Sequence, residues 1–230
     1  MIGRLGQRHA DMLEAVQFCA ERRLDEESGS VKLLVDPARI RKLMSDHRYS
    51  LEQCWTILKE LCGCVIEIET PKIRIMGGII ESAEYTKSVT RPDPLTGGQR
   101  RLWTIRLGKA WIELMRLDMT YNGNPELIIL LKSGISKAVA RFMLTHSMQR
   151  QPNGGWMLDS VIHAVAGNLD VSRMKKARHR LRCEASALHK IGVQIAIDRV
   201  YLVPQPPDEV TQPPDEVPQP PGGSAPAHVL

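Results

Sequence analysis

The chain has 230 residues and a mass of 25.8 kDa, with 43% hydrophobic, 25% charged and 4% aromatic residues and a mean hydropathy of -0.22. This length suffices for one large or two small domains with a sizeable core. The sequence has no run of 18 apolar residues and no apolar stretch of signal-peptide length at its start, which excludes a membrane span and argues against secretion. Its five cysteines have no disulfide-framework spacing, so we expect a reduced, cytoplasmic environment.

The positive charge is concentrated in one part of the chain. Residues 1–130 contain 19 bases and 18 acids, whereas residues 131–203 contain 12 bases and 4 acids. The segment from Pro204 to Leu230 has four acids and neither Lys nor Arg. The net charge is therefore +1 in the first segment and +8 in the second. This asymmetry predicts a polyanionic partner for residues 131–203.

Helices alternate with strands in the first segment. Asp36 and Pro37 are a typical N-cap and first residue of a helix, and Ser50 and Gln53 form a capping box that starts another. Helical and alternating apolar periodicities predict the other elements. In chain order we expect a helix over 7–23, a loop over 25–30, a strand over 31–35, helices from 36 and over 50–63, and hairpins over 65–75 and 79–107.

The second segment repeats this order. We expect a helix over 135–144, a turn over 151–155, a strand over 156–158, a helix capped by Asp159, a turn over 167–170, a helix over 171–191 and a hairpin over 193–203. The predicted fold is therefore α+β, with two tandem winged helices over 1–130 and 131–203. The first has an enlarged β-hairpin part.

The C-terminal segment 204–230 is rich in proline. The sequence Gln-Pro-Pro-Asp-Glu-Val occurs in it twice, at 205–210 and 212–217. Because it has little apolar surface to offset the entropy lost on ordering, we expect a disordered, polyproline-II-like tail. It is either a solvated tail without a partner, or a docking tail or an acidic competitor for a basic surface.

The predicted helix over 171–191 has the strongest functional signal. We expect its buried face to contain Val171, Met174, Ala177, Leu181, Ala185 and Leu188. Seven bases and two acids lie within 170–190. The other faces carry the candidate DNA-binding residues Ser172, Arg173, Lys175, Lys176, His179, Arg180, Arg182 and Lys190.

A helix–turn–helix order places such a helix in the DNA major groove, where Arg and Lys read guanine or neutralise phosphates. The alternative is a solvated basic face without a ligand. RNA is disfavoured, because a chain with ten aromatic residues offers few stacking platforms.

The helix over 50–63 presents a nearly neutral face. Its expected exposed residues are Glu52, Gln53, Thr56, Lys59 and Glu60, which make a poor phosphate-binding surface. We expect this half to bind protein or to make a weak secondary DNA contact, and its hairpins to offer strand edges for dimerisation.

No residue pattern indicates an enzyme, a cofactor or a metal site. Cys62 and Cys64 have no second Cys/His pair at zinc-binding spacing, so we expect buried structural cysteines. The Gly-Gly pairs at 77–78 and 97–98 are not followed by Lys-Ser or Lys-Thr, so no phosphate loop is predicted. No Ser–His–Asp or Cys–His arrangement suggests itself.

The pattern of segments resembles the plasmid replication initiators with tandem winged-helix domains. The resemblance covers about residues 7–203 and is carried by residues 35–42, 66–78, 93–98, 107–110 and 134–141. It implies binding to directly repeated origin sites as a monomer, opening of adjacent AT-rich DNA and recruitment of the host helicase and its loader. Dimers of many members repress their own gene.

In that family the C-terminal winged helix typically reads the repeat, and the N-terminal one serves dimerisation and further DNA contact. The resemblance thus implies a DNA reader over 172–190, with Arg199 on its wing, in a bacterial cytoplasm at the nucleoid or a plasmid. Two alternatives stay open: a site-specific repressor with the same fold, and an adaptor whose neutral first domain and Pro-rich tail bind proteins.

Overall fold

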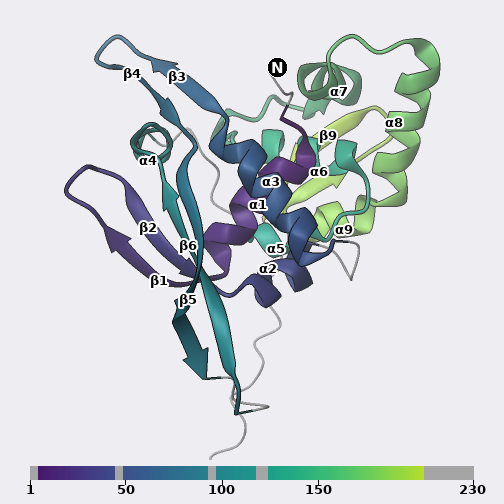
Figure 1. Cartoon of the computed structure of the whole chain (residues 1–230). Helices are drawn as coiled ribbons and strands as arrows, with labels where there is room; N and C mark the ends of the chain where they lie inside the picture. Colours follow the sequence, from purple (N-terminus) through teal and green to yellow (C-terminus); the bar gives the residue numbers. More distant parts are fainter. Residues whose placement is uncertain (1–4, 45–48, 93–96, 118–123, 205–230) are drawn as a thin grey trace, which may run out of the picture.

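The computed structural model describes residues 5–44, 49–92, 97–117 and 124–204, except the side chains of 86–89. It confirms the predicted α+β class (Figure 1). Its buried apolar residues form two clusters, one built mainly by residues 12–112 and the other by residues 128–202. We call the elements around these clusters the first unit and the second unit.

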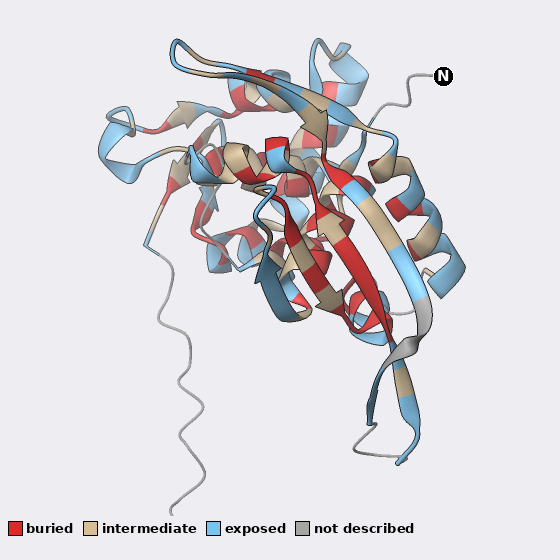
Figure 2. Ribbon diagram, turned by 60° about the vertical axis from the view of Figure 1, so that its left-hand side comes forward, coloured by how far each residue is buried: buried red, intermediate tan, exposed pale blue. Residues whose placement is uncertain are grey.

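The first unit consists of a four-stranded antiparallel sheet, a separate hairpin and four helices. The sheet has the strand order β1-β2-β6-β5, and β3 pairs with β4. In Figure 1, α1, α2 and α3 lie to one side of this sheet, and the buried residues follow its centre in Figure 2. The elements are α1 (Gln7–Phe18), β1 (Ala20–Asp25), β2 (Val31–Val35), α2 (Pro37–Met44), α3 (Leu51–Cys62), β3 (Val65–Glu69), β4 (Arg74–Gly78), β5 (Ile80–Pro92), β6 (Gln99–Leu107) and α4 (Lys109–Arg116).

The predicted helix starts are confirmed in the first unit. Asp36 Oδ1 accepts a hydrogen bond from the Ala38 N–H at 2.8 Å, at the start of α2. In α3 the Gln53 N–H donates to Ser50 Oγ at 3.1 Å, and the Ser50 N–H donates to Gln53 Oε1 at 2.7 Å. These side chains satisfy N–H groups that a helix start leaves without a partner.

Two expectations for the first unit are wrong. The first helix ends at Phe18 instead of residue 23, because the charged segment that follows pairs as edge strand β1 with β2. A strand at a sheet edge keeps its charged side chains in solvent, so it has no apolar periodicity to reveal it. In α3 the apolar spacing predicts that Leu51, Trp55, Leu58 and Leu61 are buried. The buried residues are instead Cys54, Ile57, Leu58 and Leu61, while Trp55 is half-buried and Leu51 is exposed.

The second unit packs helices against a small sheet with the strand order β7-β9-β8. The predicted helix over 135–144 and the closing hairpin are confirmed. The elements are α5 (Pro125–Ile129), α6 (Gly134–Leu144), η1 (Met148–Arg150), β7 (Trp156–Met157), α7 (Leu158–Ala166), α8 (Val171–Cys183), α9 (Ala185–Lys190), β8 (Val193–Ile195) and β9 (Arg199–Leu202).

Three details of the second unit differ from expectation. The helix predicted over 171–191 is interrupted at Glu184, which separates α8 from α9. Asp159 lies inside the first turn of α7, whose N-cap is Met157, and it pairs with Arg178. Val171 is 88% exposed, since α8 meets the core only from Met174 onwards.

Buried ion pairs join the two units through α1 and α6. The Arg141 guanidinium donates to both carboxylate oxygens of Glu14 at 2.7 Å and to Asp11 Oδ1 at 2.6 Å. It also donates to the Gln7 side-chain oxygen, and the Lys137 ammonium donates to Asp11 Oδ2. Burial alone lowers the pKa of Arg141, but the hydrogen bonds and charges of Glu14 and Asp11 raise it above its usual value.

The short helix α5 is shared by the two units. Ile128 belongs to the buried cluster of the second unit, and the next residue, Ile129, belongs to that of the first. Both side chains are almost completely buried. Consecutive residues on a helix point about 100° apart, so a single turn reaches both cores.

The predicted disorder of the tail falls on residues 205–230, outside the described residues, as do residues 93–96 of one segment that carries the resemblance. Among the described helices, none is long and apolar enough to cross a membrane.

We expect Arg141→Ala to lower the free energy of unfolding by about 3–5 kcal/mol, because it leaves the carboxylates of Asp11 and Glu14 buried without their main partner. Urea denaturation measures this loss. Arg150→Ala is the matched control: Arg150 is exposed, and we expect its loss to change stability by less than about 0.5 kcal/mol. Equal effects of the two substitutions would contradict a structural role of the ion pairs.

Candidate nucleic-acid interface

The helices α7 and α8 are joined by a tight turn over 167–170. Gly167 has a φ of 72°, a left-handed conformation that glycine adopts without strain. Asp170 then starts α8, because its Oδ1 accepts a hydrogen bond from the Arg173 N–H at 2.8 Å. The turn and the cap together fix the direction in which α8 leaves α7.

One side of α8 is apolar and the other is basic. Met174, Ala177 and Leu181 are buried against the second unit's core, as predicted. All seven predicted site residues of α8 are exposed: Ser172, Arg173, Lys175, Lys176, His179, Arg180 and Arg182. Lys190 is exposed on α9, beyond the interruption, and Arg199 is half-buried on β9.

Arg173, Lys176 and Arg180 line one flank of α8. They border an open pocket of about 480 Å³, together with Gly134 and Ile135 of α6. Arg173 also pairs with Asp170 at 3.3 Å. Neither Lys176 nor Arg180 has an acidic side chain within 4.0 Å among the residues that the structure describes, so this flank keeps its positive charge.

Lys175 and Arg182 lie on the other flank of α8, and Arg182 contacts the closing hairpin. The Arg182 guanidinium donates to the Ile197 carbonyl at 2.7 Å, in the turn between β8 and β9. This bond holds the hairpin turn beside α8. Arg199 is directed elsewhere, since its guanidinium donates to the Gly155 carbonyl at 3.4 Å.

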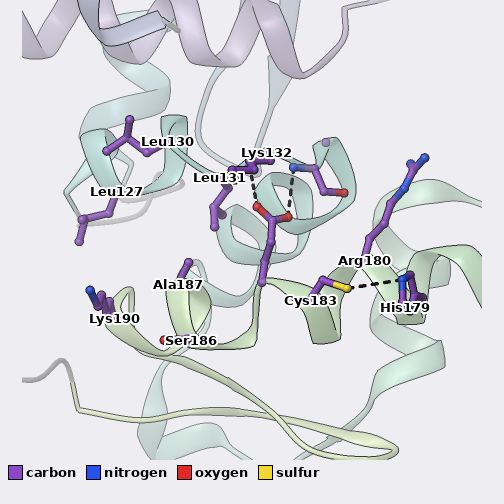
Figure 3. Close-up of a pocket in the computed structure, with 13 residues that line it drawn as sticks. Leu127, Leu130, Leu131, Lys132, His179, Arg180, Cys183, Ser186, Ala187 and Lys190 are labelled. Atoms are coloured by element: carbon purple, nitrogen blue, oxygen red, sulfur yellow. Dashed lines mark hydrogen bonds between the residues drawn. The ribbon is translucent and has the colours of Figure 1, made fainter. Parts of the chain in front are cut away.

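A second basic pocket, of about 930 Å³, lies between α8–α9 and the α5–α6 connection (Figure 3). Lys132, Arg180 and Lys190 line it, so the structure brings Arg180 and Lys190 to one surface despite the helix interruption. Lys132 is a basic residue that the sequence analysis missed. Its only sequence signal is its position directly before the start of α6.

Glu184, the residue that separates α8 from α9, also lines this pocket. Its carboxylate accepts hydrogen bonds from the Lys132 N–H at 2.5 Å and from the Ser133 N–H at 3.1 Å, drawn as dashed lines in Figure 3. The side chain of Glu184 thus connects the junction of α8 and α9 to the two residues that precede α6.

Arg178 lies between the basic surface and the core. Its guanidinium donates to Asp159 Oδ1 at 2.6 Å, which connects α8 to the first turn of α7. The hydrogen bond from Arg178 holds the pKa of the Asp159 carboxyl below its usual value, and the same contact raises the pKa of Arg178. This pair fixes the angle between the two helices.

The exposed face of α3 has little net charge, as predicted. Glu52, Gln53, Thr56 and Lys59 are exposed. Glu60 is half-buried and accepts hydrogen bonds from Arg8 at 2.8 Å and His9 at 2.7 Å, and the bond from His9 lowers the pKa of Glu60. It therefore joins α3 to α1 instead of facing a ligand.

The two cysteines at the end of α3 are less buried than expected. Cys62 and Cys64 are half-buried at the edge of the first unit's core, and the Cys64 thiol donates to the Glu60 carbonyl at 3.2 Å. Within the described part of the chain, no group of three or more His, Cys, Asp or Glu residues is placed to hold a metal ion.

Comparison of the chain with protein-family models, with curated proteins and with solved structures finds no match.

We expect Asp159→Asn to lower stability at neutral pH and to lose this effect in acid. Because the folded state lowers the pKa of Asp159, the ion pair stabilises the fold above about pH 4 and is lost as the pH falls through the lowered pKa. Urea denaturation at pH 7, 5, 4 and about 2.5 measures the difference between wild type and variant. In an Arg178→Met background the same substitution should show no such pH dependence; a persisting dependence would contradict the pairing.

Proposed function

We propose that this chain is a replication initiator that binds double-stranded DNA sequence-specifically, through α8 in the second unit. The single observation that carries the DNA-binding part of the proposal is the exposed basic face of α8. This helix follows a helix and a tight turn and lies beside a hairpin connected to it by Arg182. A recognition helix in this arrangement enters the major groove, with its N-terminal residues at the base edges.

The charge of α8 supports a polyanionic ligand. Lys175, Lys176 and Arg180 have no acidic neighbour within 4.0 Å among the described residues, and Lys132 and Lys190 extend the basic surface. Such cations bind phosphates and release counterions. Near the first turn, Arg173 is the residue that we expect to bond guanine, and the exposed Val171 offers methyl groups to the methyl of thymine.

We also propose that both units are winged helices. In the second unit, α6, β7, α7, α8, β8 and β9 follow one another in the order expected of a winged helix. The first unit begins α1, β1, β2, α2, α3 and continues with the hairpin β3–β4, with two further strands, β5 and β6, completing its sheet. The nearly neutral α3 suits a protein contact or a secondary DNA contact better than base reading.

The initiator role itself rests on the resemblance of the sequence segments to plasmid initiators. The role includes recruitment of the host helicase and its loader, and dimerisation through the first unit. The edge strands β1 and β5 of the four-stranded sheet are suited to such a contact with a second copy. No ATP-driven or other catalytic step is part of the proposal.

A footprint on the DNA flanking the chain's own gene, at two salt concentrations, tests the proposal. Several evenly spaced protected repeats beside an AT-rich tract support an initiator, and weaker protection at the higher salt supports phosphate contacts. One symmetric site over the promoter would instead indicate a repressor. No protection at either salt would exclude both DNA functions and leave a protein-binding adaptor.

We expect Arg173→Ala and Lys176→Ala each to weaken specific binding by about 1–3 kcal/mol if the side chain reads a base. Fluorescence anisotropy with a labelled site measures the change. Lys59→Ala on α3 removes the same charge from an exposed helix of the first unit, and Glu52→Ala removes an acid there; both should have little effect. Unchanged binding by both α8 variants would show that α8 is not the recognition helix.

A further inference from the structure

The first unit has a groove of about 750 Å³ where α2 and α3 meet the strands β5 and β6. Its apolar wall includes Pro37, Leu51, Trp55 and Tyr85, and Trp103 forms its floor. Trp103 is only 4% exposed and packs edge-on against Trp55, with ring centroids 5.1 Å apart.

Two large apolar or aromatic side chains of this wall are exposed to solvent. Leu51 is 42% exposed and Tyr85 is 52% exposed, and both border the groove. No element of the described chain covers them. A contiguous apolar and aromatic surface of this kind marks an interaction site more often than a lone exposed residue does.

A cation lies at the same edge of the groove. The Arg101 guanidinium is 5.9 Å from the centre of the Tyr85 ring and donates to the Tyr85 hydroxyl at 3.1 Å. It is exposed and has no carboxylate within 4.0 Å among the described residues. The neighbouring Arg100 differs, since it pairs with Asp36 at 3.2 Å. Arg101 is therefore available to an acidic ligand next to an aromatic ring.

An aromatic groove with an exposed arginine at its edge is suited to one class of ligand. Grooves walled by Trp and Tyr bind polyproline-II segments, whose rings pack flat on aromatic side chains and whose conformation costs little entropy to fix. An arginine beside the groove favours a segment in which prolines are followed by acids. The sequence of this chain contains such a segment twice, as Pro-Pro-Asp-Glu at 206–209 and 213–216.

We propose that the groove binds the Pro-Pro-Asp-Glu repeats of the chain's own C-terminal segment. The prolines pack against Tyr85 and Trp55, and the acids pair with Arg101. The proposal is independent of DNA binding.

The length of the C-terminal segment sets how far the repeats extend from Pro204. At about 3.1 Å per residue, the 26 residues after Pro204 extend up to about 80 Å, and the second repeat ends about 40 Å along. A folded chain of this size has a radius of gyration of about 17 Å. The second repeat can therefore contact a groove whose path over the surface from Pro204 is no longer than about 40 Å, and the first repeat only one within about 15 Å.

The test uses a dye-labelled peptide with the sequence of residues 204–218, titrated with full-length chains and followed by fluorescence anisotropy. One chain carries Pro206→Ala, Pro207→Ala, Pro213→Ala and Pro214→Ala, which should free its groove. We expect this tail variant to bind the peptide about tenfold more tightly than wild type, whose own tail competes at an effective concentration of about 1 mM. No binding to the tail variant would overturn the proposal.

Substitutions in the groove locate the contact. In the tail variant, Tyr85→Ala and Arg101→Glu should each weaken peptide binding by at least about fivefold, and both residues are exposed, so thermal unfolding should be nearly unchanged. Arg150→Glu makes the same charge change on the second unit and should have no effect. A loss of binding through Lys176→Glu, with the groove variants unaffected, would place the tail on α8 and overturn the proposal.

Discussion

The arrangement of the two units depends on a buried arginine. Arg141 of α6 is held by Asp11 and Glu14 of α1, and removing such charges from water is unfavourable unless every hydrogen bond is made. The geometry is therefore restricted: α6 cannot slide along α1 without leaving a carboxylate unpaired. Because α6 packs against α7 and α8, the same contact determines where the basic face of α8 points relative to the first unit.

The features that local chemistry determines were predictable. The predicted caps at Asp36 and Ser50 form with residues two or three positions away, and each starts a helix, whereas the cap predicted at Asp159 is wrong. The hairpins also follow from alternation and turn residues. By contrast, β1 has charged side chains without apolar periodicity, and only its pairing with β2 makes it a strand. Sequence periodicity contains no information about such a partner.

In the candidate interface, too, some features follow from the local sequence and others from contacts with distant residues. The exposed basic residues of α8 follow from helical spacing, whereas the interruption at Glu184 depends on backbone N–H groups 51 and 52 residues earlier. For this reason Lys132, from a distant connection, joins Arg180 and Lys190 at one pocket. Val171, predicted to be buried, is exposed because the first turn of α8 extends past the core. Long-range contacts thus decide the outline of the surface, and the local sequence decides its charge.

The single turn of α5 has a consequence for dissecting the molecule. Ile128 and Ile129 fill different cores, so no cut between residues 125 and 131 yields two intact halves. A fragment that ends before Ile129 has a hole in the first core, and one that begins after Ile128 has a hole in the second. If one unit is exchanged for another in evolution, α5 must be kept, or be replaced by a turn whose side chains fill both cores. The boundary between the units is a shared part of both.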